Sequence, residues 1–203
     1  KNPSHSTKRP DPEHTADSTN QFSSQLGSAS GGFITLEATA DQVTAAKKEM
    51  IEKTALDMVT ALAVIVNAEL GNWDKAAAYF YGAPGKFAYT IYGRAEKRCA
   101  NYGTCNGQGG EASVNTAIGQ ALTANDDATV IKYIKVLYCQ NVLRSANKID
   151  QNMDDPIEII AEGQAFWRIL APWMTAHSND AAKIFDRMFS TELNPQAANN
   201  YNY

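Results

Sequence analysis

The sequence predicts an all-α protein, a single-domain bundle of six to seven helices with extended polar tails at both ends. Three observations predict this fold class. Apolar residues recur at helical spacing through most of the chain after residue 32. No segment alternates strictly between apolar and polar residues or carries a β-branched run. The connections between the periodic segments are short, as they are in helix bundles.

Composition divides the 203-residue chain into three parts. Residues 1–32 are rich in Ser, Thr, Pro, Asn, Gln and Gly, and their only large apolar residues are Phe22 and Leu26. Such a segment buries too little apolar area to offset the entropy of ordering it. We therefore expect a polar arm over 1–32, one helical domain over 33–193, and a polar tail over 194–203.

The first expected helix is the longest and covers residues 40–70. Two of its flanks are mostly apolar at 3.6-residue spacing, so we expect it to lie centrally in the bundle, with both flanks covered. The first flank consists of Ile51, Ala55, Met58, Leu62, Ile65 and Glu69. The second flank consists of Asp57, Ala61, Val64 and Ala68.

Six further helices are expected, most of them bounded by local start or stop signals. Gly103 should stop one of them, and Pro156 occupies the first helical position after the acidic pair Asp154-Asp155. Pro172 should kink or end that helix, because it offers no N–H donor. The expected ranges are 73–81, 89–101, 111–124, 126–149, 156–171 and 179–191.

The three cysteines predict one disulfide and one free thiol. Cys99 and Cys105 bracket a Tyr-Gly turn, and their spacing suits a small ring that staples a helix end to its exit loop. Cys139 lies in an apolar stretch and is expected to be a buried thiol. A local bridge favours an oxidising compartment. Since the chain begins at Lys1 without a signal-peptide pattern, a processed mature form is the simplest interpretation.

Charge and hydropathy exclude two classes of partner. A net charge of −4, with dispersed basic residues, disfavours nucleic acid, which requires a concentrated basic surface. No apolar run approaches the roughly 18–20 residues that span a bilayer, so no membrane span is expected. The nearest run, over 61–68, is expected to be a buried helix segment.

Carboxylates on apolar faces are the first candidates for a functional site. Glu162 shares a helical stripe with Phe166 and Ile169, and Asp57 and Glu69 lie on apolar flanks. A buried carboxylate must be paired, protonated or bound to a cation. Two interpretations follow: an internal ion pair, with Arg144, Arg98 or Lys148 as counterions, or a metal ligand.

Tyrosines are the second candidates, since five of the nine lie between residues 79 and 102. Phenolate and carboxylate oxygens are hard donors that suit a ferric ion. Aromatic packing with the hydroxyl at the rim is the alternative. The five are Tyr79, Tyr81, Tyr89, Tyr92 and Tyr102.

Catalytic and other metal motifs are absent from the sequence. No His-Glu-x-x-His, Glu-x-x-His or Cys-x-x-Cys pattern occurs, which disfavours a zinc or ferritin-type site. The Gly-rich loop over 107–110 follows no predicted strand and lacks the Gly-Lys-Ser/Thr ending of a phosphate loop. Because no nucleophile and base can be paired, we expect a protein that is not an enzyme.

Several segments together resemble the Fea1-type family of algal low-iron-inducible periplasmic proteins, also described as high-CO2-inducible extracellular proteins. The most specific is Arg94-Ala95-Glu96-Lys97-Arg98-Cys99, and the similarity extends over about 40–190. The resemblance implies a secreted or periplasmic algal protein associated with iron assimilation and without catalytic activity. The other segments begin at Ala55-Leu56-Asp57-Met58, Gly71-Asn72-Trp73, Ser113-Val114-Asn115 and Ala161-Glu162-Gly163.

Two functions are therefore expected as alternatives. The first is an extracellular or periplasmic iron-binding protein, with ferric iron as the metal. Its expected ligands are Glu69, Asp74, Glu162 and Tyr79. The second is a structural subunit of an extracellular filament or larger assembly, in which the arm that carries Phe22 and Leu26 docks on a neighbouring subunit.

Overall fold

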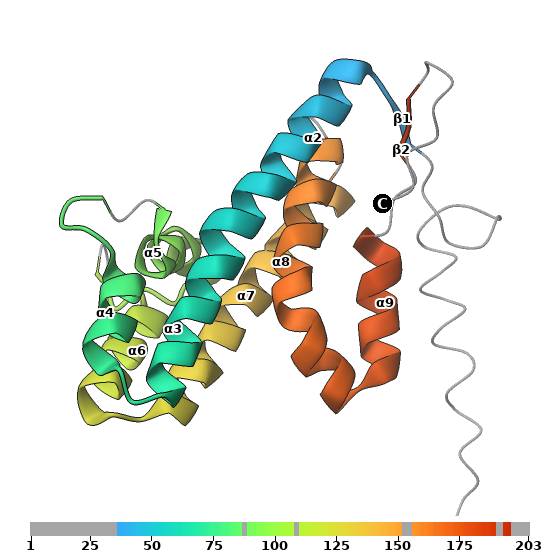
Figure 1. Cartoon of the computed structure of the whole chain (residues 1–203). Helices are drawn as coiled ribbons and strands as arrows, with labels where there is room; N and C mark the ends of the chain where they lie inside the picture. Colours follow the sequence, from blue (N-terminus) through green and yellow to red (C-terminus); the bar gives the residue numbers. More distant parts are fainter. Residues whose placement is uncertain (1–35, 87–88, 108–109, 152–155, 190–192, 196–203) are drawn as a thin grey trace, which may run out of the picture. The chain divides into compact units, whose positions relative to one another are not determined.

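The computed structural model describes residues 36–86, 89–107, 110–151, 156–189 and 193–195. These residues form an all-α bundle (Figure 1), which confirms the predicted fold class. The expected arm, with Phe22 and Leu26, lies outside the described residues, as do Asp154, Asp155 and residues 196–203.

Seven continuous helices are present in the described part of the chain. The longest is a rod made of α2, a π-helical turn η1, and α3, without a break between them. The rod comprises α2 (Ala40–Lys53), η1 (Thr54–Met58) and α3 (Val59–Glu69). The other helices are α4 (Trp73–Tyr81), α5 (Ile91–Tyr102), α6 (Ser113–Ala124), α7 (Asp127–Asp150), α8 (Pro156–His177) and α9 (Asn179–Phe189).

Two three-residue strands, which the sequence did not predict, join the ends of this unit. β1 (Leu36–Ala38) precedes the rod, and β2 (Leu193–Pro195) follows α9. They pair in parallel, with Leu36 opposite Leu193.

Local capping explains where several helices begin and end. Thr39 starts α2 with a capping box: its Oγ1 accepts a hydrogen bond from the Gln42 N–H at 3.3 Å, and the Gln42 side chain accepts one from the Thr39 N–H at 3.0 Å. Gly103 ends α5 in the left-handed conformation, with φ at 62°, as its position predicted. Asn125 ends α6 in the same way.

Of the two outcomes expected at Pro172, a kink or an end of the helix, the end is wrong, because α8 continues to His177. Proline at this position leaves the carbonyl of Arg168 without its helical donor. Arg168 and Pro172 both lie on the exposed side of α8, where water can solvate that carbonyl. The missing hydrogen bond is therefore inexpensive here.

The expectation that both flanks of the rod would be covered is also wrong. Asp57, Ala61, Val64 and Ala68, the second flank, are buried, whereas Ile51 and Leu62 of the first are exposed. Glu69 is exposed as well. The π-helical turn is one reason, since it changes the number of residues per turn between α2 and α3 and moves residues of one nominal stripe onto different sides.

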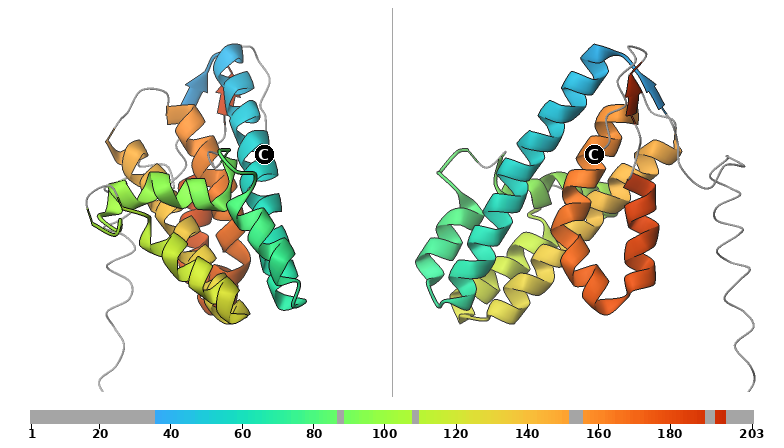
Figure 2. Two further views of the ribbon diagram at one scale, coloured as in Figure 1. Left: turned by 90° about the vertical axis from the view of Figure 1, so that its left-hand side faces the viewer. Right: turned by 45° about the vertical axis from the view of Figure 1, so that its right-hand side comes forward.

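The main core gathers around α7, which contacts α3, α5, α6 and α8. Its largest fully buried side chains include Tyr138, Phe80 and Phe166. A second, smaller cluster of Val43, Ala46, Ile157 and Ala161 forms where α2 packs on α8. Figure 2 shows α9 returning beside α8, and Phe189 of α9 is fully buried.

Gly163 lets α8 approach its neighbours, and Gly163→Ala tests this packing. An added Cβ would meet the ring of buried Phe189 and lie 2.9 Å from the Ser145 Cβ. Overpacking of this kind costs about 1–3 kcal/mol, more than the ~1 kcal/mol that helical Ala gains over Gly. We expect a lower free energy of unfolding in urea, with little change in the neighbouring control Gln164→Ala. An unchanged urea midpoint for Gly163→Ala would show that α9 can shift to make room for the methyl group, and would contradict tight packing at this position.

Candidate functional site

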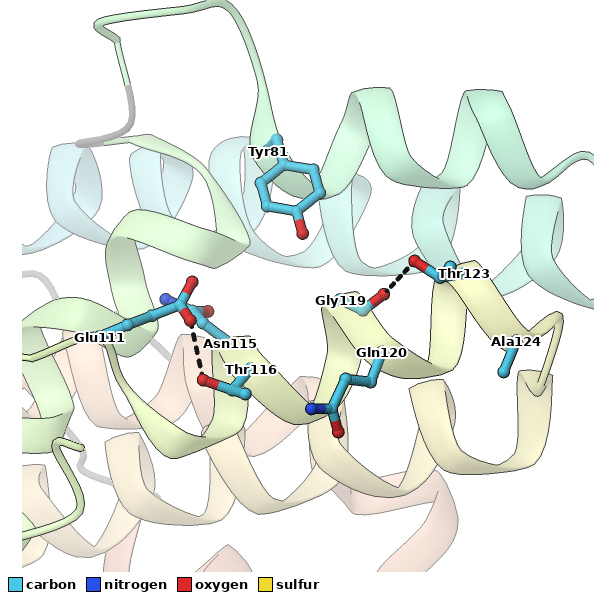
Figure 3. A pocket seen from close by; sticks show the side chains of 8 residues that line it. All are labelled: Tyr81, Glu111, Asn115, Thr116, Gly119, Gln120, Thr123 and Ala124. Carbon is cyan, nitrogen blue, oxygen red and sulfur yellow. Dashed lines mark hydrogen bonds between the residues drawn. The ribbon is translucent and has the colours of Figure 1, made fainter.

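An open pocket of about 460 Å³ lies between the end of α4 and one side of α6 (Figure 3). Tyr81 contributes the α4 side, and Glu111 precedes α6. We call it the α6 pocket. Its lining residues are Tyr81, Glu111, Asn115, Thr116, Gly119, Gln120, Thr123 and Ala124.

The side-chain amide of Asn115 is the most unusual group in this pocket. Asn115 is 1% exposed, and its Nδ2 donates to the Tyr92 carbonyl at 3.0 Å and to Glu96 Oε1 at 2.6 Å. These two acceptors assign the amide orientation, since the reverse would set the Asn115 oxygen against both of them. Asn115 Oδ1 is left buried without a hydrogen-bond partner. A buried acceptor without a donor costs about 1–3 kcal/mol, so this oxygen is suited to a ligand.

Two carboxylates flank Asn115. Glu111 Oε2 accepts a hydrogen bond from Thr116 Oγ1 at 2.8 Å. Glu96 Oε1 accepts from the Ala112 N–H at 2.9 Å in addition to Asn115. Figure 3 shows Glu111, Asn115 and Thr116 at one end of the pocket. Acceptor oxygens therefore predominate at that end.

Two phenols report the electrostatics of the pocket. Burial, a hydrogen bond to Glu111 and the charges of Glu111 and Glu96 raise the pKa of Tyr92 to about 12. Burial and the charge of Glu111 raise the pKa of Tyr81 as well. The two rings are neighbours, with centroids 5.5 Å apart. Burial disfavours a charge of either sign, whereas the carboxylates of Glu111 and Glu96 disfavour only a further anion, so it is these two charges that favour a cation here.

Gly119 makes room for the Tyr81 hydroxyl. A Cβ on Gly119 would lie 2.6 Å from the Tyr81 oxygen. Figure 3 shows this hydroxyl pointing from α4 towards α6. The missing side chain thus lets a phenol oxygen approach the same helix that carries Asn115.

The disulfide between Cys99 and Cys105 holds the loop that carries Glu111, and it confirms the predicted bridge. Cys105 pairs with Ala112 in an isolated antiparallel bridge. The Asn106 N–H donates to the Glu111 carbonyl at 2.8 Å, and the Ser113 N–H donates to the Thr104 carbonyl at 2.9 Å. The disulfide therefore fixes both the end of α5 and the loop that leads into α6. Cys139 is a free thiol as predicted, although half-buried, and burial raises its pKa.

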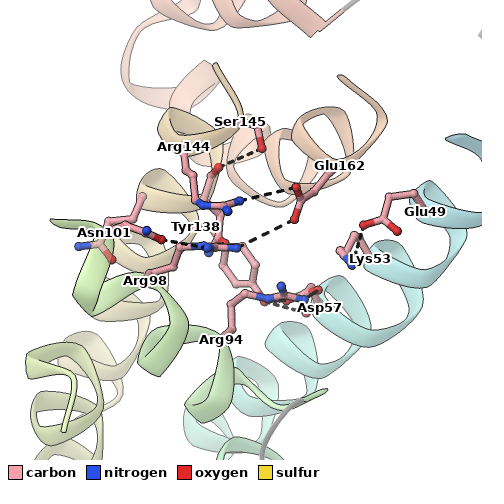
Figure 4. Close-up of polar contacts among 12 residues, drawn as sticks. Glu49, Lys53, Asp57, Arg94, Arg98, Asn101, Tyr138, Arg144, Ser145 and Glu162 are labelled. Atoms are coloured by element: carbon pink, nitrogen blue, oxygen red, sulfur yellow. Dashed lines mark hydrogen bonds and ion pairs between the residues drawn. The ribbon is translucent and has the colours of Figure 1, made fainter. Parts of the chain in front are cut away.

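A separate cluster of buried charges joins the rod to α5, α7 and α8 (Figure 4). Arg94 donates to both oxygens of Asp57, from Nε at 2.9 Å and from Nη2 at 2.7 Å. The Tyr138 hydroxyl donates to the Asp57 carbonyl at 3.1 Å. The guanidinium of Arg94 lies 5.2 Å from the centroid of the Phe166 ring. Burial acts to lower the pKa of Arg94, but the Asp57 carboxylate outweighs it and raises that pKa.

Glu162 belongs to the same cluster, which confirms the ion-pair interpretation of this residue. Its two carboxylate oxygens lie 4.0 Å from Arg98 Nη2 and from Arg144 Nη1, respectively. Arg98 Nε also donates to Asn141 Oδ1 at 2.6 Å. Burial and the nearby charge of Arg144 lower the pKa of Arg98 to about 10. Glu162 is thus neutralised by two guanidinium groups.

The structure does not bring the four expected metal ligands together. Glu69 and Asp74 are exposed on either side of the turn between α3 and α4, and Tyr79 is exposed in the last turn of α4. Glu162 lies in the charge cluster with Asp57, and Glu69 is ~18 Å further along the rod from Asp57 at 1.5 Å per residue.

Two of the five tyrosines, Tyr81 and Tyr92, lie side by side, and Tyr92 also packs against Phe80, as the aromatic-packing alternative expects. Glu96, Glu111 and Asn115 were not among the site residues predicted from the sequence. Only Asn115 could have been found from the sequence, because it shares a helical stripe with Ile118 and Leu122 and its side-chain amide would therefore be buried. Among the residues that the structure describes, no three His, Cys, Asp or Glu side chains gather to hold a metal ion. A cation here would need amide and phenol oxygens as well.

Fold and site together define a disulfide-bonded helical bundle with an electronegative, oxygen-lined pocket. Comparison with known proteins finds no matching protein-family model, no matching curated protein and no matching solved structure. Within the described residues, no helix has the length and apolar character needed to cross a membrane.

Asp57→Asn tests the charge cluster. The change leaves the Arg94 guanidinium buried without a counter-charge, which costs about 3–5 kcal/mol. We expect urea unfolding to show a loss of that size. The matched control is Asp180→Asn, because that carboxylate is 94% exposed and pairs with Lys183 at 3.4 Å. Equal losses for the two variants would contradict the role assigned to Asp57.

Replacement of Cys99 and Cys105 by serine tests the bridge. Opening a ring of this size costs about 2 kcal/mol in the chain-entropy account. We expect the urea midpoint of the unchanged protein to fall on reduction, and the double variant to unfold at the lower midpoint with or without reductant. A midpoint that does not respond to reductant would contradict a stabilising bridge.

Proposed function

We propose that this protein binds a hard cation, ferric iron, in the α6 pocket and does not act as a catalyst. The buried and unpartnered Oδ1 of Asn115 carries the proposal, because an acceptor that meets no protein donor is satisfied by a cation. Hard cations prefer carboxylate, carbonyl and phenolate oxygens. The α6 pocket offers these donors within an electronegative environment.

Four side chains are the proposed ligands. Glu111 contributes its carboxylate, which in the free protein accepts hydrogen bonds from Thr116 and from Tyr92. Asn115 contributes its amide oxygen, and Tyr81 and Tyr92 contribute phenol oxygens. Glu96 orients Asn115 through the 2.6 Å hydrogen bond and adds negative charge. Iron would displace the phenolic protons, and the nearby carboxylates that oppose phenolate in the free protein would then be neutralised by the metal.

We further propose an extracellular or periplasmic location and a role in iron assimilation. The disulfide supports the location, since such bridges persist in oxidising compartments. The resemblance to the Fea1-type algal proteins supports the role. The alternative of a filament subunit depends on Phe22 and Leu26, which lie outside the described residues.

A ferric titration against a weak competing chelator tests the binding proposal. We expect saturable binding with a visible tyrosinate-to-iron charge-transfer band. Glu111→Gln keeps the shape of the side chain but removes its charge, so it should weaken binding by more than about tenfold, the equivalent of 1.4 kcal/mol. Tyr92→Phe should weaken the charge-transfer band.

Matched controls locate the site. Tyr79→Phe removes an exposed phenol two residues from Tyr81, and Glu69→Gln removes an exposed carboxylate; both should bind as the unchanged protein does. Gly119→Ala should displace the Tyr81 hydroxyl and weaken binding without loss of stability, because Ala favours the helix by up to ~1 kcal/mol. Uptake no greater than the chelator background, or full binding by Glu111→Gln, would refute the proposed site.

A further inference from the structure

The rod carries a continuous apolar stripe on its exposed side. Its large members are exposed to unusual extents: Ile51 69%, Val59 61%, Leu62 43%, Val66 46% and Leu70 69%. Ala55, between the first two, is exposed as well. We call these six residues the outer stripe. Single exposed apolar residues are ordinary on a protein surface, but six in line are typical of an interaction site.

The outer stripe lies opposite the core-facing side of the rod. Every outer-stripe residue from Ile51 to Val66 is followed, two positions later, by a buried residue. These buried residues are Lys53, Asp57, Ala61, Val64 and Ala68. Two residues correspond to about 200° around a helix. In the left-hand view of Figure 2 the rod runs along the edge of the bundle. Helices that are apolar on opposite sides are normally covered on both.

The sequence spacing of the outer stripe is symmetric about its midpoint. Successive members are separated by four, four, three, four and four residues. A second copy that runs antiparallel about a two-fold axis would therefore place Ile51 opposite Leu70, and Val59 opposite Leu62. Spacings of three and four residues are those of helices that pack side by side. The stripe from Ile51 to Leu70 is ~28 Å long at 1.5 Å per residue.

Charge at the two ends favours the antiparallel arrangement. Exposed Lys48 lies one turn before the stripe, and at its other end exposed Glu69 and Asp74 outnumber exposed Lys75. An antiparallel copy brings the Lys48 end of one chain to the acidic end of the other, twice. The acidic residues at the basic end, Glu49 and Glu52, both pair with Lys53, whose Nζ lies 2.7 Å from Glu49 Oε1 and 3.7 Å from Glu52 Oε1. A parallel copy would set like ends against each other.

We propose that the outer stripe is the interface of a two-fold symmetric, antiparallel homodimer. A self-complementary stripe with opposite charges at its ends is what an isologous contact requires, since the same surface serves both subunits. An unrelated helical partner would need neither property. The proposal is independent of the α6 pocket, which lies on α4 and α6 rather than on the rod.

Sedimentation of the full chain over a range of concentrations tests this proposal. We expect a dimer, and Val59→Glu should raise its dissociation constant more than about tenfold, since it buries a charge at the centre of the interface. Circular dichroism and thermal unfolding should show that the variant stays folded. Ile184→Glu is the matched control: Ile184 is 43% exposed on α9, away from the rod, and its variant should remain a dimer.

Cysteine cross-linking then tests the register, in a Cys139→Ser background. Ile51→Cys chains mixed with Leu70→Cys chains should form a disulfide-linked dimer, whereas neither should cross-link alone. Cross-linking of Ile51→Cys by itself would indicate a parallel pair and overturn the proposal. A chain that stays monomeric at all concentrations, or a dimer that survives Val59→Glu, would also overturn it. In that case the arm over 1–32 or another protein would be the occupant.

Discussion

The bidentate contact between Arg94 and Asp57 is the interaction on which the rest of the structure depends. It joins the π-helical turn to α5, and the Tyr138 hydroxyl and the Phe166 ring tie α7 and α8 to the same two residues. A buried ion pair of this kind adds little net stability over an apolar pair of similar size. It does select one geometry, because both hydrogen bonds form only at one rotation of α5 and one registry of the rod. We therefore regard it as the contact that sets the arrangement of these helices.

Helix α5 transmits that constraint to the candidate site. Arg94 and Arg98 occupy one side of α5 and enter the charge cluster, whereas Tyr92 and Glu96, also four residues apart, face Asn115 and Glu111. Cys99, one turn after Ala95, anchors the loop that returns to Glu111. The pocket is thus held from the core side by charge and from the loop side by a covalent bond. The side chains of the proposed site are therefore held in place by the fold itself, which is the condition for selective binding.

Local chemistry explains which features the sequence could predict. The helices, the stop at Gly103 and the bridge between Cys99 and Cys105 depend on neighbours within a few residues, and all were predicted. The ion pairing of Glu162 was predictable too, since a carboxylate on an apolar stripe requires a counterion. The buried side of the rod was not, because both of its flanks are apolar and periodicity alone does not rank them.

The candidate site could not be predicted for a different reason. Asn115 meets Glu96 from 19 positions along the chain, and Glu111 meets Tyr92 from a similar separation. Periodicity places each residue on a side of its own helix, but it does not say which sides of two helices meet. For that reason the four ligands expected from the sequence lie on α3, α4 and α8 and do not form one site. The three missed residues become candidates only once α5 and α6 are packed together.

The π-helical turn has a consequence for how this chain can vary in length. Because η1 holds one more residue per turn than an α-helix, it sets the rotational phase between α2 and α3. The extra residue is accommodated within the turn, so loss of one residue there would return the rod to a regular α-helix with the residues on either side kept in place. The same deletion within α2 or α3 would instead rotate everything downstream by about 100°. The π-helical turn is therefore the position at which the rod can change its length without changing which side of it faces the core.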